Sequence, residues 1–298
     1  MDPQSWGFVV IACFFASDLH GSRERYASLF RAIEAEGPRA IFLGGDLLPP
    51  PFARGARPAP ESDDFLNDYL AVRLEGLRER LADRYPAVFV ILGNDDARFE
   101  EAALLDVAAR GLLRYAHDRR LPFGAYDVCG YSCVPPTPFR LKDWERYDVS
   151  RFVDPGCVSP EEGARTVPVA ANEVRYGTIQ QDLDRLAGDR AQDRTVYLFH
   201  TPPHRTLLDR AALDGKTIDH VPLDVHVGSI AVRRFIETRQ PWLTLHGHVH
   251  ESASITGAWR DQLGRTPMLS GAHDGKELAL VRFDLEEPGS ATRELIDG

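Results

Sequence analysis

Residues Leu245–His250 read LHGHVH, which places three histidines within five residues. Histidine is the protein side chain that most often binds metals. On an extended backbone, side chains two residues apart point to the same face, so His248 and His250 could reach one metal site together. A buried or solvated histidine cluster is the alternative, and the rest of the chain decides between the two.

The composition of this 298-residue chain is that of a globular protein, with 43% hydrophobic and 27% charged residues. Its formal net charge is −10 at pH 7, so we expect no strong nucleic-acid binding. The four cysteines are too few for a disulfide framework in a chain of this length. No internal repeat or linker is evident, and we predict a single domain over residues 1–298.

The apolar run Phe8–Ala16 is too short to span a bilayer. It has no basic leader, and it continues into a polar motif instead of a small-residue cleavage site. We therefore predict that it is a buried strand of a cytoplasmic protein that has no membrane partner.

Continuous apolar runs predict strands that are covered on both faces. The runs are Phe8–Ala16, Ala40–Leu43, Ala87–Leu92, Thr195–Phe199 and Trp242–Leu245. Apolar residues at helical spacing between the runs predict helices, one of them capped by Ser22 and another beginning at Ser229. Short runs near Ser254, Met268 and Leu278–Phe283 predict antiparallel closing strands. This pattern predicts an α/β fold, in which ligands bind at the carboxyl ends of the strands.

Residues 134–176 are rich in charge, proline and glycine and show no clear period. A long unpatterned segment within a compact domain is usually functional or disordered, so we expect an irregular insertion that covers the mouth of the site. Its proline-stiffened start carries Thr137 and Arg140, which could grip a phosphate or a nucleotide. His204, after a later Pro-Pro turn, could also face the substrate. We predict that Trp144 packs the insertion.

Each of the five predicted strands ends in residue types that bind metals. These residues are Asp18, His20, Asp46, Asn94, His200, His248 and His250. Any one of them alone would be read as a cap or a turn residue, but all of them at one sheet edge indicate a metal site. Imidazole and carboxylate ligands together suit two first-row transition metals, and Mn, Fe, Zn and Co all fit.

The order of these motifs resembles that of the calcineurin-like metallophosphoesterase superfamily, in particular its Icc-related bacterial and archaeal branch. The motifs are SDLHG at Ser17–Gly21, GD at Gly45–Asp46, GNxD at Gly93–Asp96, HTPP at His200–Pro203, HVGS at His226–Ser229 and HGHVHES at His246–Ser252. The resemblance covers residue 8 to about residue 285 apart from the irregular middle. It implies a four-layer α/β/β/α sandwich of two mixed sheets flanked by helices.

The same resemblance implies a dinuclear, metal-dependent phosphoester hydrolase whose nucleophile is a metal-bridging hydroxide. It assigns one metal to Asp18, His20, Asp46 and His250. It assigns the other to Asp46, Asn94, His200 and His248, with Asp46 as the bridge. The substrate would be a small-molecule phosphoester or a nucleotide.

One position departs from the family pattern. The family usually has a histidine after the asparagine, placed to protonate the leaving group, whereas this chain has Asp95. An ordinary aspartate is ionised at pH 7, so we expect Asp95 to be a poor general acid. We therefore predict a preference for phosphodiesters whose leaving group needs little protonation. Asn94, Asp95 and His246 are the candidate catalytic residues, and His246 would orient a ligand or a substrate oxygen unless it only packs.

Two alternatives remain open at the level of the sequence. A phosphomonoesterase or protein phosphatase would use the same ligands on another substrate. A catalytically silent scaffold or interaction module would keep the fold without the chemistry. Against the scaffold, every ligand position carries a residue able to bind metal, and only the leaving-group histidine is missing. The sequence predicts no oligomeric state.

Overall fold

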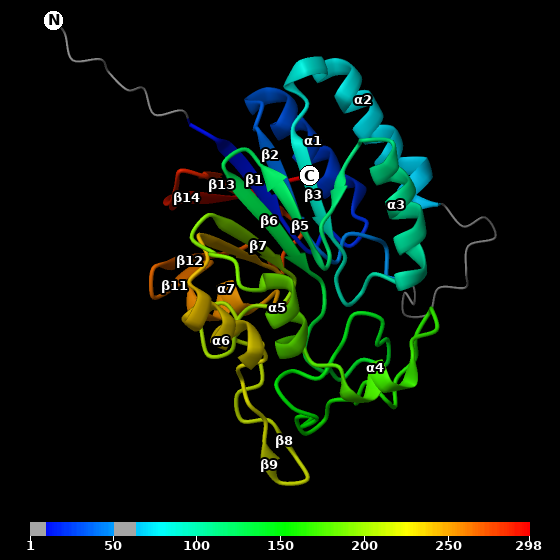
Figure 1. Cartoon of the computed structure of the whole chain (residues 1–298), viewed down its shortest axis with the longest axis vertical. Coiled ribbons are helices and arrows are strands. Elements are labelled where there is room, and N and C mark those ends of the chain that lie inside the picture. The colour runs from blue at the N-terminus through cyan, green and yellow to red at the C-terminus, as the bar shows by residue number, and fades with distance from the viewer. Residues whose placement is uncertain (1–9, 51–63) are drawn as a thin grey trace, which may run out of the picture.

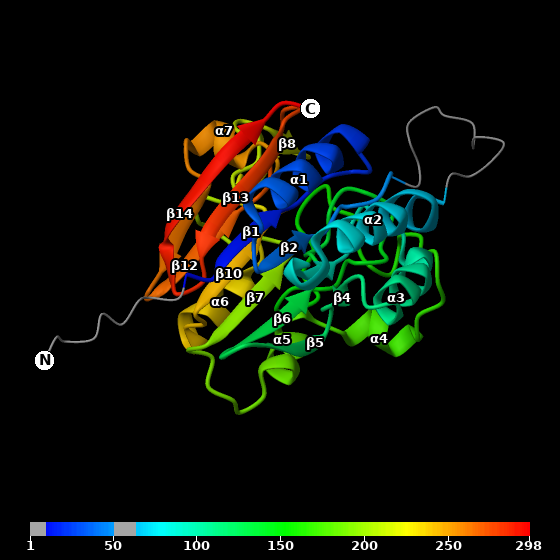
Figure 2. The ribbon, with the colours of Figure 1, turned by 90° about the horizontal axis from the view of Figure 1, so that it is seen from above.

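The computed structural model describes residues 10–50 and 64–298. Two mixed sheets of six strands pack face to face, and helices cover both outer faces (Figure 1, Figure 2). This arrangement confirms the predicted four-layer α/β/β/α sandwich. Phe8 and Val9, the start of the first predicted strand, lie outside the described residues.

The first sheet has the strand order β14-β13-β1-β2-β3-β4. In that order its strands span Glu287–Ile296, Leu278–Asp284, Ala12–Ala16, Ala40–Gly44, Ala87–Ile91 and Arg114–Tyr115. Strands β1 to β4 are parallel, while β13 is antiparallel to β1 and β14 is antiparallel to β13. The carboxyl ends of β1, β2 and β3 therefore meet at one edge.

The second sheet has the strand order β11-β12-β10-β7-β6-β5. In that order its strands span Arg260–Leu263, Thr266–Ser270, Leu243–His246, Thr195–Phe199, Tyr126–Tyr131 and Arg119–Phe123. Strands β12, β10, β7 and β6 are parallel, and an antiparallel strand lies at each edge. A separate small hairpin joins β8 (Thr217–Ile218) to β9 (Val221–Pro222).

Helices α1, α2 and α3 lie on the outer side of the first sheet, and α5 and α6 lie on the outer side of the second (Figure 2). The helices are α1 (Arg23–Glu36), α2 (Val72–Leu81), α3 (Glu101–Ala109), α4 (Ala171–Tyr176), α5 (Ile179–Ala187), α6 (Ile230–Arg239) and α7 (Ser252–Thr256), with a π-helical segment at Phe65–Ala71 and 3₁₀ turns at Ala82–Arg84 and Arg98–Glu100. As predicted, the Ser22 side chain caps α1 and the Ser229 side chain caps α6. Among the described residues, no helix combines the length and apolar character needed to cross a membrane.

The parallel strands are apolar on both faces because each sheet is covered twice. In β1, Cys13 and Phe15 belong to the core between the sheets, whereas Phe14 and Ala16 pack with the outer helices. Phe42 of β2 lies opposite Phe89 of β3, and their rings stack 5.3 Å apart in that inner core. This packing on both sides fixes the directions in which the strand ends present the residues that follow them.

Two of the predicted closing strands are wrong in part. The run near Ser254 is the helix α7, which ends at Gly257 with a left-handed φ of 72°. The run around Met268 is a strand that pairs antiparallel with β11, as predicted, but parallel with β10 on its other side. The prediction for Leu278–Phe283 is confirmed, since β13 pairs antiparallel with β1.

The segment 134–176 has one short helix, α4, and otherwise isolated bridges, two of them within the segment and one from Tyr147 to Thr178. It lies at the same end of the molecule as the β8-β9 hairpin (Figure 1). Its centre is fixed by Trp144, which is 1% exposed, and by a fully buried ion pair between Lys142 and Glu145. The predicted packing role of Trp144 is therefore what the structure shows.

Candidate metal centre

Seven polar side chains follow the parallel strands at one edge of the sandwich. We call this set the candidate metal centre, and its members are Asp18, His20, Asp46, Asn94, His200, His248 and His250. Strands β1, β2 and β3 of the first sheet and β7 and β10 of the second position them. The structure thus brings together all the residues that the sequence singled out as metal ligands, although their binding of metal remains a prediction.

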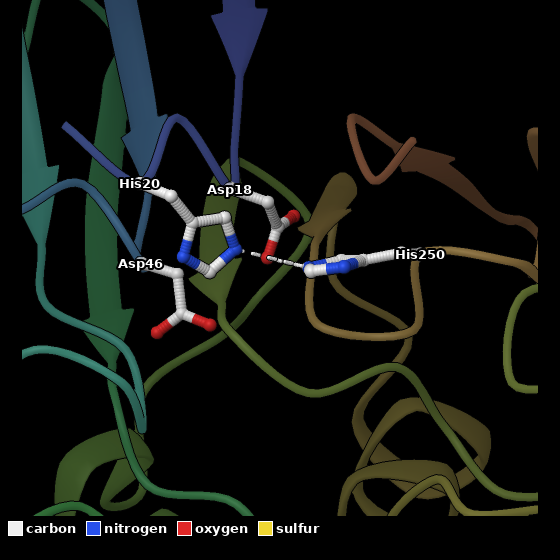
Figure 3. Close-up of side chains that lie close together, drawn as sticks. All are labelled: Asp18, His20, Asp46 and His250. Atoms are coloured by element: carbon white, nitrogen blue, oxygen red, sulfur yellow. Dashed lines mark hydrogen bonds and ion pairs between the residues drawn. The ribbon is translucent and has the colours of Figure 1, made fainter. Parts of the chain in front are cut away.

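Asp18, His20, Asp46 and His250 form the first group (Figure 3). Each residue offers one ligand atom, and these atoms lie within 4.8 Å of one another. The Nε2 atoms of His20 and His250 face each other at 3.2 Å, and His250 Nε2 lies 3.3 Å from Asp18 Oδ1. Ring nitrogens and carboxylate oxygens that converge in this way suit a first-row transition metal.

The second group contains Asp46, His200 and His248, whose ligand atoms also lie within 4.8 Å of one another. The Nε2 atom of His200 is 3.3 Å from Asp46 Oδ2 and 3.1 Å from Asn94 Oδ1. Asp46 is the residue common to both groups. The arrangement therefore has room for two cations that share one carboxylate.

The ring of His200 is oriented by the backbone beside it. Its Nδ1 donates to the Gly44 carbonyl oxygen at 2.8 Å, and the side chain has no exposed surface. This hydrogen bond keeps a proton on Nδ1, so Nε2, which faces Asp46 and Asn94, is the ring nitrogen that would bind a metal. The backbone of β2 thus sets the tautomer of a residue from the other sheet.

Charges within the centre are strongly coupled. Burial alone would lower the pKa of His200, but the carboxylates of Asp46 and Asp18 raise it to about 10. In His250 the same opposition between burial and the Asp18 carboxylate raises the pKa to about 9. Burial lowers the pKa of His248 to about 3. Two buried carboxylates thus dominate the potential of the centre, which favours cations.

Four of the candidate ligands have left-handed backbone conformations. The φ angles are 57° at Asp18, 45° at His20, 52° at Asp46 and 73° at His248. Such conformations cost non-glycine residues on the order of 1–3 kcal/mol each, and they cluster at functional sites. The Asp18 carboxylate holds one of them in place by accepting the His248 N–H at 3.0 Å. Local strain thus serves the convergence of the ligands.

Two glycines allow the strand ends to approach each other. A Cβ atom at Gly45, where φ is 93°, would lie 2.6 Å from His200 Nδ1. A Cβ atom at Gly93 would collide with the Asp46 carboxylate. The loops after β2 and β3 therefore require glycine so that Asp46 can reach both groups.

The last residue of the GNxD motif, Asp96, has a role that the sequence reasoning did not assign. This fully buried carboxylate accepts the backbone N–H groups of Leu47, Leu48 and Gly93. Burial and the nearby Asp46 raise its pKa to about 7. Asp96 therefore joins the loop after β2 to the loop after β3. Its position as the last residue of the GNxD motif was the one feature of the sequence that could have indicated this role.

Arg25 is a second residue that the sequence reasoning missed. Its guanidinium donates to the Asp18 carbonyl oxygen at 2.6 Å and to the carbonyl oxygens of Gly275 and Lys276. It thereby connects the loop after β1 to the loop between β12 and β13. Nothing in its helical position in the sequence distinguishes it from an ordinary surface arginine.

His246 does not have the expected contact with a ligand or a substrate. Its Nδ1 donates to the Thr201 carbonyl oxygen at 3.0 Å, and its Nε2 accepts the Thr244 hydroxyl at 2.8 Å. The side chain is fully buried, and burial lowers its pKa to about 4. Both ring nitrogens are engaged by the protein, which favours the packing alternative, and the catalytic assignment of His246 stays a prediction. Strand β10 ends at His246, so the alternation that grouped it with His248 stops there.

Asp95 lies at the rim of the centre with a side chain that is 39% exposed. Its Oδ2 is 3.9 Å from His20 Nδ1, and its Oδ1 accepts the Asn94 amide at 3.1 Å. Partial burial and the Asp46 carboxylate raise the pKa of Asp95. A carboxyl group therefore occupies the place beside the centre where the family usually has an imidazole.

The three residues predicted to contact a substrate lie in different environments. Thr137 is buried, and its hydroxyl donates to Glu145 at 2.6 Å, so it supports the insertion and cannot also grip a substrate. Arg140, three residues on, is exposed. His204 lies with Nε2 3.3 Å from an oxygen of Asp224. Contact of Arg140 and His204 with a substrate remains a prediction.

The start of α6 is occupied by the insertion. Asp148 accepts the Ser229 hydroxyl and the N–H groups of Ile230 and Ala231. A carboxylate of the chain thus fills the place where an external anion could sit against the amide groups of this helix. The nearby His226 is held by Asp209 at 2.8 Å. The insertion therefore reaches the loop that follows β7.

Solved structures share this fold across nearly the whole chain. One crystal structure aligns with a TM-score of 0.61 and 16% identity over 97% of this chain and 100% of its own. The crystal structure of TT1561 of Thermus thermophilus aligns with a TM-score of 0.54 and 17% identity, over 96% of this chain and 99% of its own. At such identities the likeness shows the fold alone.

Among curated proteins, no sequence matches the chain. The sequence model of the calcineurin-like phosphoesterase family matches residues 13–252, a span that contains every member of the candidate metal centre. Because this match covers most of the 298 residues, the chain belongs to the calcineurin-like phosphoesterase family.

Proposed function

We propose that this protein is a dinuclear, metal-dependent phosphoester hydrolase with a preference for diesters. One observation carries the proposal: the carboxylate of Asp46 belongs to both groups of convergent ligand atoms. Imidazole and carboxylate groups gathered around one common carboxylate are ligand types that first-row transition metals prefer, so two cations that share Asp46 would suit both groups.

Asp18, His20, Asp46 and His250 would hold one metal ion. Asp46, Asn94, His200 and His248 would hold the other. When bound, the ions supply Lewis acidity toward phosphoryl oxygens and lower the pKa of water, and Mn, Fe, Zn and Co all suit these ligands.

The chain itself orients the candidate ligands. The Gly44 carbonyl oxygen fixes the ring of His200, and the Asp18 carboxylate fixes the backbone of His248. Asp96 joins the loops after β2 and β3 by accepting a backbone N–H group from each of them. Neighbouring groups therefore hold the candidate ligands in position before a metal or a substrate binds. Such pre-organisation accounts for much of the rate enhancement of enzymes.

The preference for diesters is supported by Asp95. Asp95 places a carboxyl group at the rim of the candidate metal centre. At neutral pH a carboxyl group is a less effective general acid than an imidazole, because its ordinary pKa lies well below 7. Esters whose leaving group departs without protonation are then favoured. We propose small phosphodiesters, cyclic nucleotides among them, as the substrate class.

The proposal is tested by metal analysis of the purified protein, paired with hydrolysis assays. We expect about two transition-metal ions per chain and faster turnover of bis-p-nitrophenyl phosphate than of p-nitrophenyl phosphate. Absence of bound metal together with no turnover after addition of Mn, Zn, Fe or Co would overturn the hydrolase assignment. Faster turnover of the monoester would overturn the diester preference alone.

A further inference from the structure

A second cavity, of about 420 Å³, lies away from the candidate metal centre. Its lining residues come from the end of β6, from helix α5 and from the insertion with its helix α4, elements whose places in the fold are labelled in Figure 1. None of the candidate metal ligands lines it. We call it the insertion cavity.

The walls of the insertion cavity carry many charges. The basic side chains are Arg98, Lys142, Arg146, Arg165 and Arg185, and the acidic ones are Asp118, Asp143, Glu145, Glu173 and Asp182. The formal charges balance, so the distribution of partners decides what the cavity can bind. Every one of these carboxylates already accepts hydrogen bonds from, or pairs with, groups of the protein.

The basic groups are not satisfied to the same degree. Arg146 pairs with Glu173 and Asp182, and Lys142 pairs with Glu145. Within the described residues, however, the guanidinium of Arg165 has no carboxylate partner and donates only to the Pro160 carbonyl oxygen at 2.7 Å.

Arg98 is the second guanidinium with spare donors. Its closest carboxylate in the described chain is Glu101, whose oxygen lies 3.4 Å from Nε. The guanidinium lies over the ring of Trp144, 5.1 Å from the centroid, so it is held in place by a contact that leaves N–H groups free. Arg98 and Arg165 therefore bring unused donors to one cavity.

Like charges also converge here. Burial lowers the pKa of Arg165, the carboxylates of Asp143 and Glu145 oppose this, and the guanidinium groups of Arg146 and Arg98 add smaller contributions that lower it. A partly buried guanidinium without a carboxylate partner, beside a second guanidinium with spare donors, suits a ligand that carries an anionic group.

His117 adds a neutral donor to the same wall. Its Nδ1 accepts the Ser132 N–H at 3.0 Å, which leaves the proton on Nε2. Burial and the surrounding arginines lower the pKa of His117 to about 3, so the ring stays uncharged at neutral pH. The indole N–H of Trp144, beside it, is buried without a hydrogen-bond partner.

We propose that the insertion cavity binds the phosphate group of a small phosphorylated molecule through Arg98 and Arg165. Guanidinium groups match the geometry of phosphate oxygens with paired N–H donors, and such charge-assisted hydrogen bonds are the strong ones. A volume of about 420 Å³ exceeds the needs of a bare phosphate and falls in the range of small-molecule sites. Val169, Val174 and the ring of His117 provide less polar wall for the remainder of the ligand.

The test is isothermal titration calorimetry of the full chain with inorganic phosphate, adenosine 5′-monophosphate and adenosine. Measurements with and without a metal chelator separate the insertion cavity from the metal centre, where phosphate would bind only through metals. In the chelated protein we expect the nucleotide to bind more tightly than phosphate, and adenosine not to bind. This outcome does not depend on the proposed hydrolase activity.

Arg98→Met and Arg165→Met should each weaken nucleotide binding about tenfold or more, as expected for a lost hydrogen bond between charged groups. Arg175→Met is the matched control, since Arg175 belongs to the same insertion, is 56% exposed in its side chain and does not line the cavity. It should leave the affinity unchanged. If Arg165→Met does not fold, Arg165→Lys keeps the charge and should still weaken binding by losing the paired donors.

Three results would overturn the proposal. They are no binding of either anion by the chelated wild-type chain, equal affinity of the wild-type, Arg98→Met and Arg165→Met chains, and an equal loss in Arg175→Met. Binding of adenosine as tight as that of the nucleotide would also contradict it, because the site would then not recognise phosphate.

Discussion

The candidate metal centre and the buried ion pair of the insertion are both polar clusters removed from water, but they differ in the partners that their polar atoms face. Lys142 and Glu145 are fully buried, and the carboxylate accepts hydrogen bonds from the ammonium group and from both donors of Thr137. At the metal centre, by contrast, the Nε2 atoms of His20 and His250 face each other at 3.2 Å.

This difference shows how a structural cluster is told from a functional one. In the buried pair, the ammonium group of Lys142 donates to the Glu145 carboxylate and to the Thr137 carbonyl oxygen, so the pair needs nothing from outside and holds an irregular segment in place. In the candidate metal centre, ring nitrogens and carboxylate oxygens from separate loops converge, and Asp46 is common to both groups, an arrangement that the two proposed cations would complete. Four left-handed residues add strain there that the insertion pair lacks.

The largest expected effect comes from removing the shared charge. Asp46→Asn should lower turnover by at least about a thousandfold, near 4 kcal/mol in activation free energy, and should reduce the bound metal. Metal analysis and kinetics with bis-p-nitrophenyl phosphate measure both effects. The exposed Asp214→Asn serves as control and should change neither. Full metal content in Asp46→Asn would remove the distinction between the two clusters.

Breaking the insertion pair should affect stability instead of chemistry. Lys142→Met leaves the carboxylate of Glu145 buried with hydrogen-bond partners but no opposite charge, which should lower the free energy of unfolding by about 3 kcal/mol. Urea unfolding measures the loss, and Lys216→Met, at an exposed lysine, controls for the charge. Metal content should be unchanged. A loss of metal in Lys142→Met would contradict the separation.

His117 provides a pH test away from the metals. Burial and nearby arginines lower its pKa from 6.5 to about 3, so the unfolded chain binds its proton first as the pH falls. The contribution to stability is complete above pH 6.5 and is lost progressively below it, by up to about 2 kcal/mol between pH 7 and pH 5. His117→Gln should show a shallower fall in unfolding free energy over this range. Identical pH profiles for both proteins would argue against the assigned cause.

The smallest expected effect concerns the rim of the centre. Asp95→His should speed the hydrolysis of alkyl phosphate esters about tenfold, near 1.4 kcal/mol, because an imidazole can protonate a poor leaving group. Activated aryl esters, which need no such proton, should be hydrolysed at an unchanged rate and serve as the internal control. An unchanged or lower rate for alkyl esters would show that Asp95 does not limit the choice of substrate.

The sequence by itself determined where the strands end and which residues follow them. Apolar runs predict β1, β2, β3, β7 and β10, and each run is local enough to be read without the rest of the chain. Parallel strands of one sheet align their carboxyl ends, so the proximity of Asp18 and Asp46 follows from the runs, whereas His200 reaches them only because the two sheets pack face to face. Side-chain caps at Ser22 and Ser229 were predictable for the same local reason.

Only the tertiary structure decided how these residues are used. The backbone leaves the strand after His246, which sends His248 and His250 to different groups and turns His246 toward Thr201. The hydroxyl of Thr137 donates to Glu145. Whether a charged side chain of the insertion cavity is paired depends on how α5 and the loop after β3 pack beside the insertion. Strand ends follow from local periodicity, whereas partners depend on contacts between segments far apart in the chain, which no local pattern encodes.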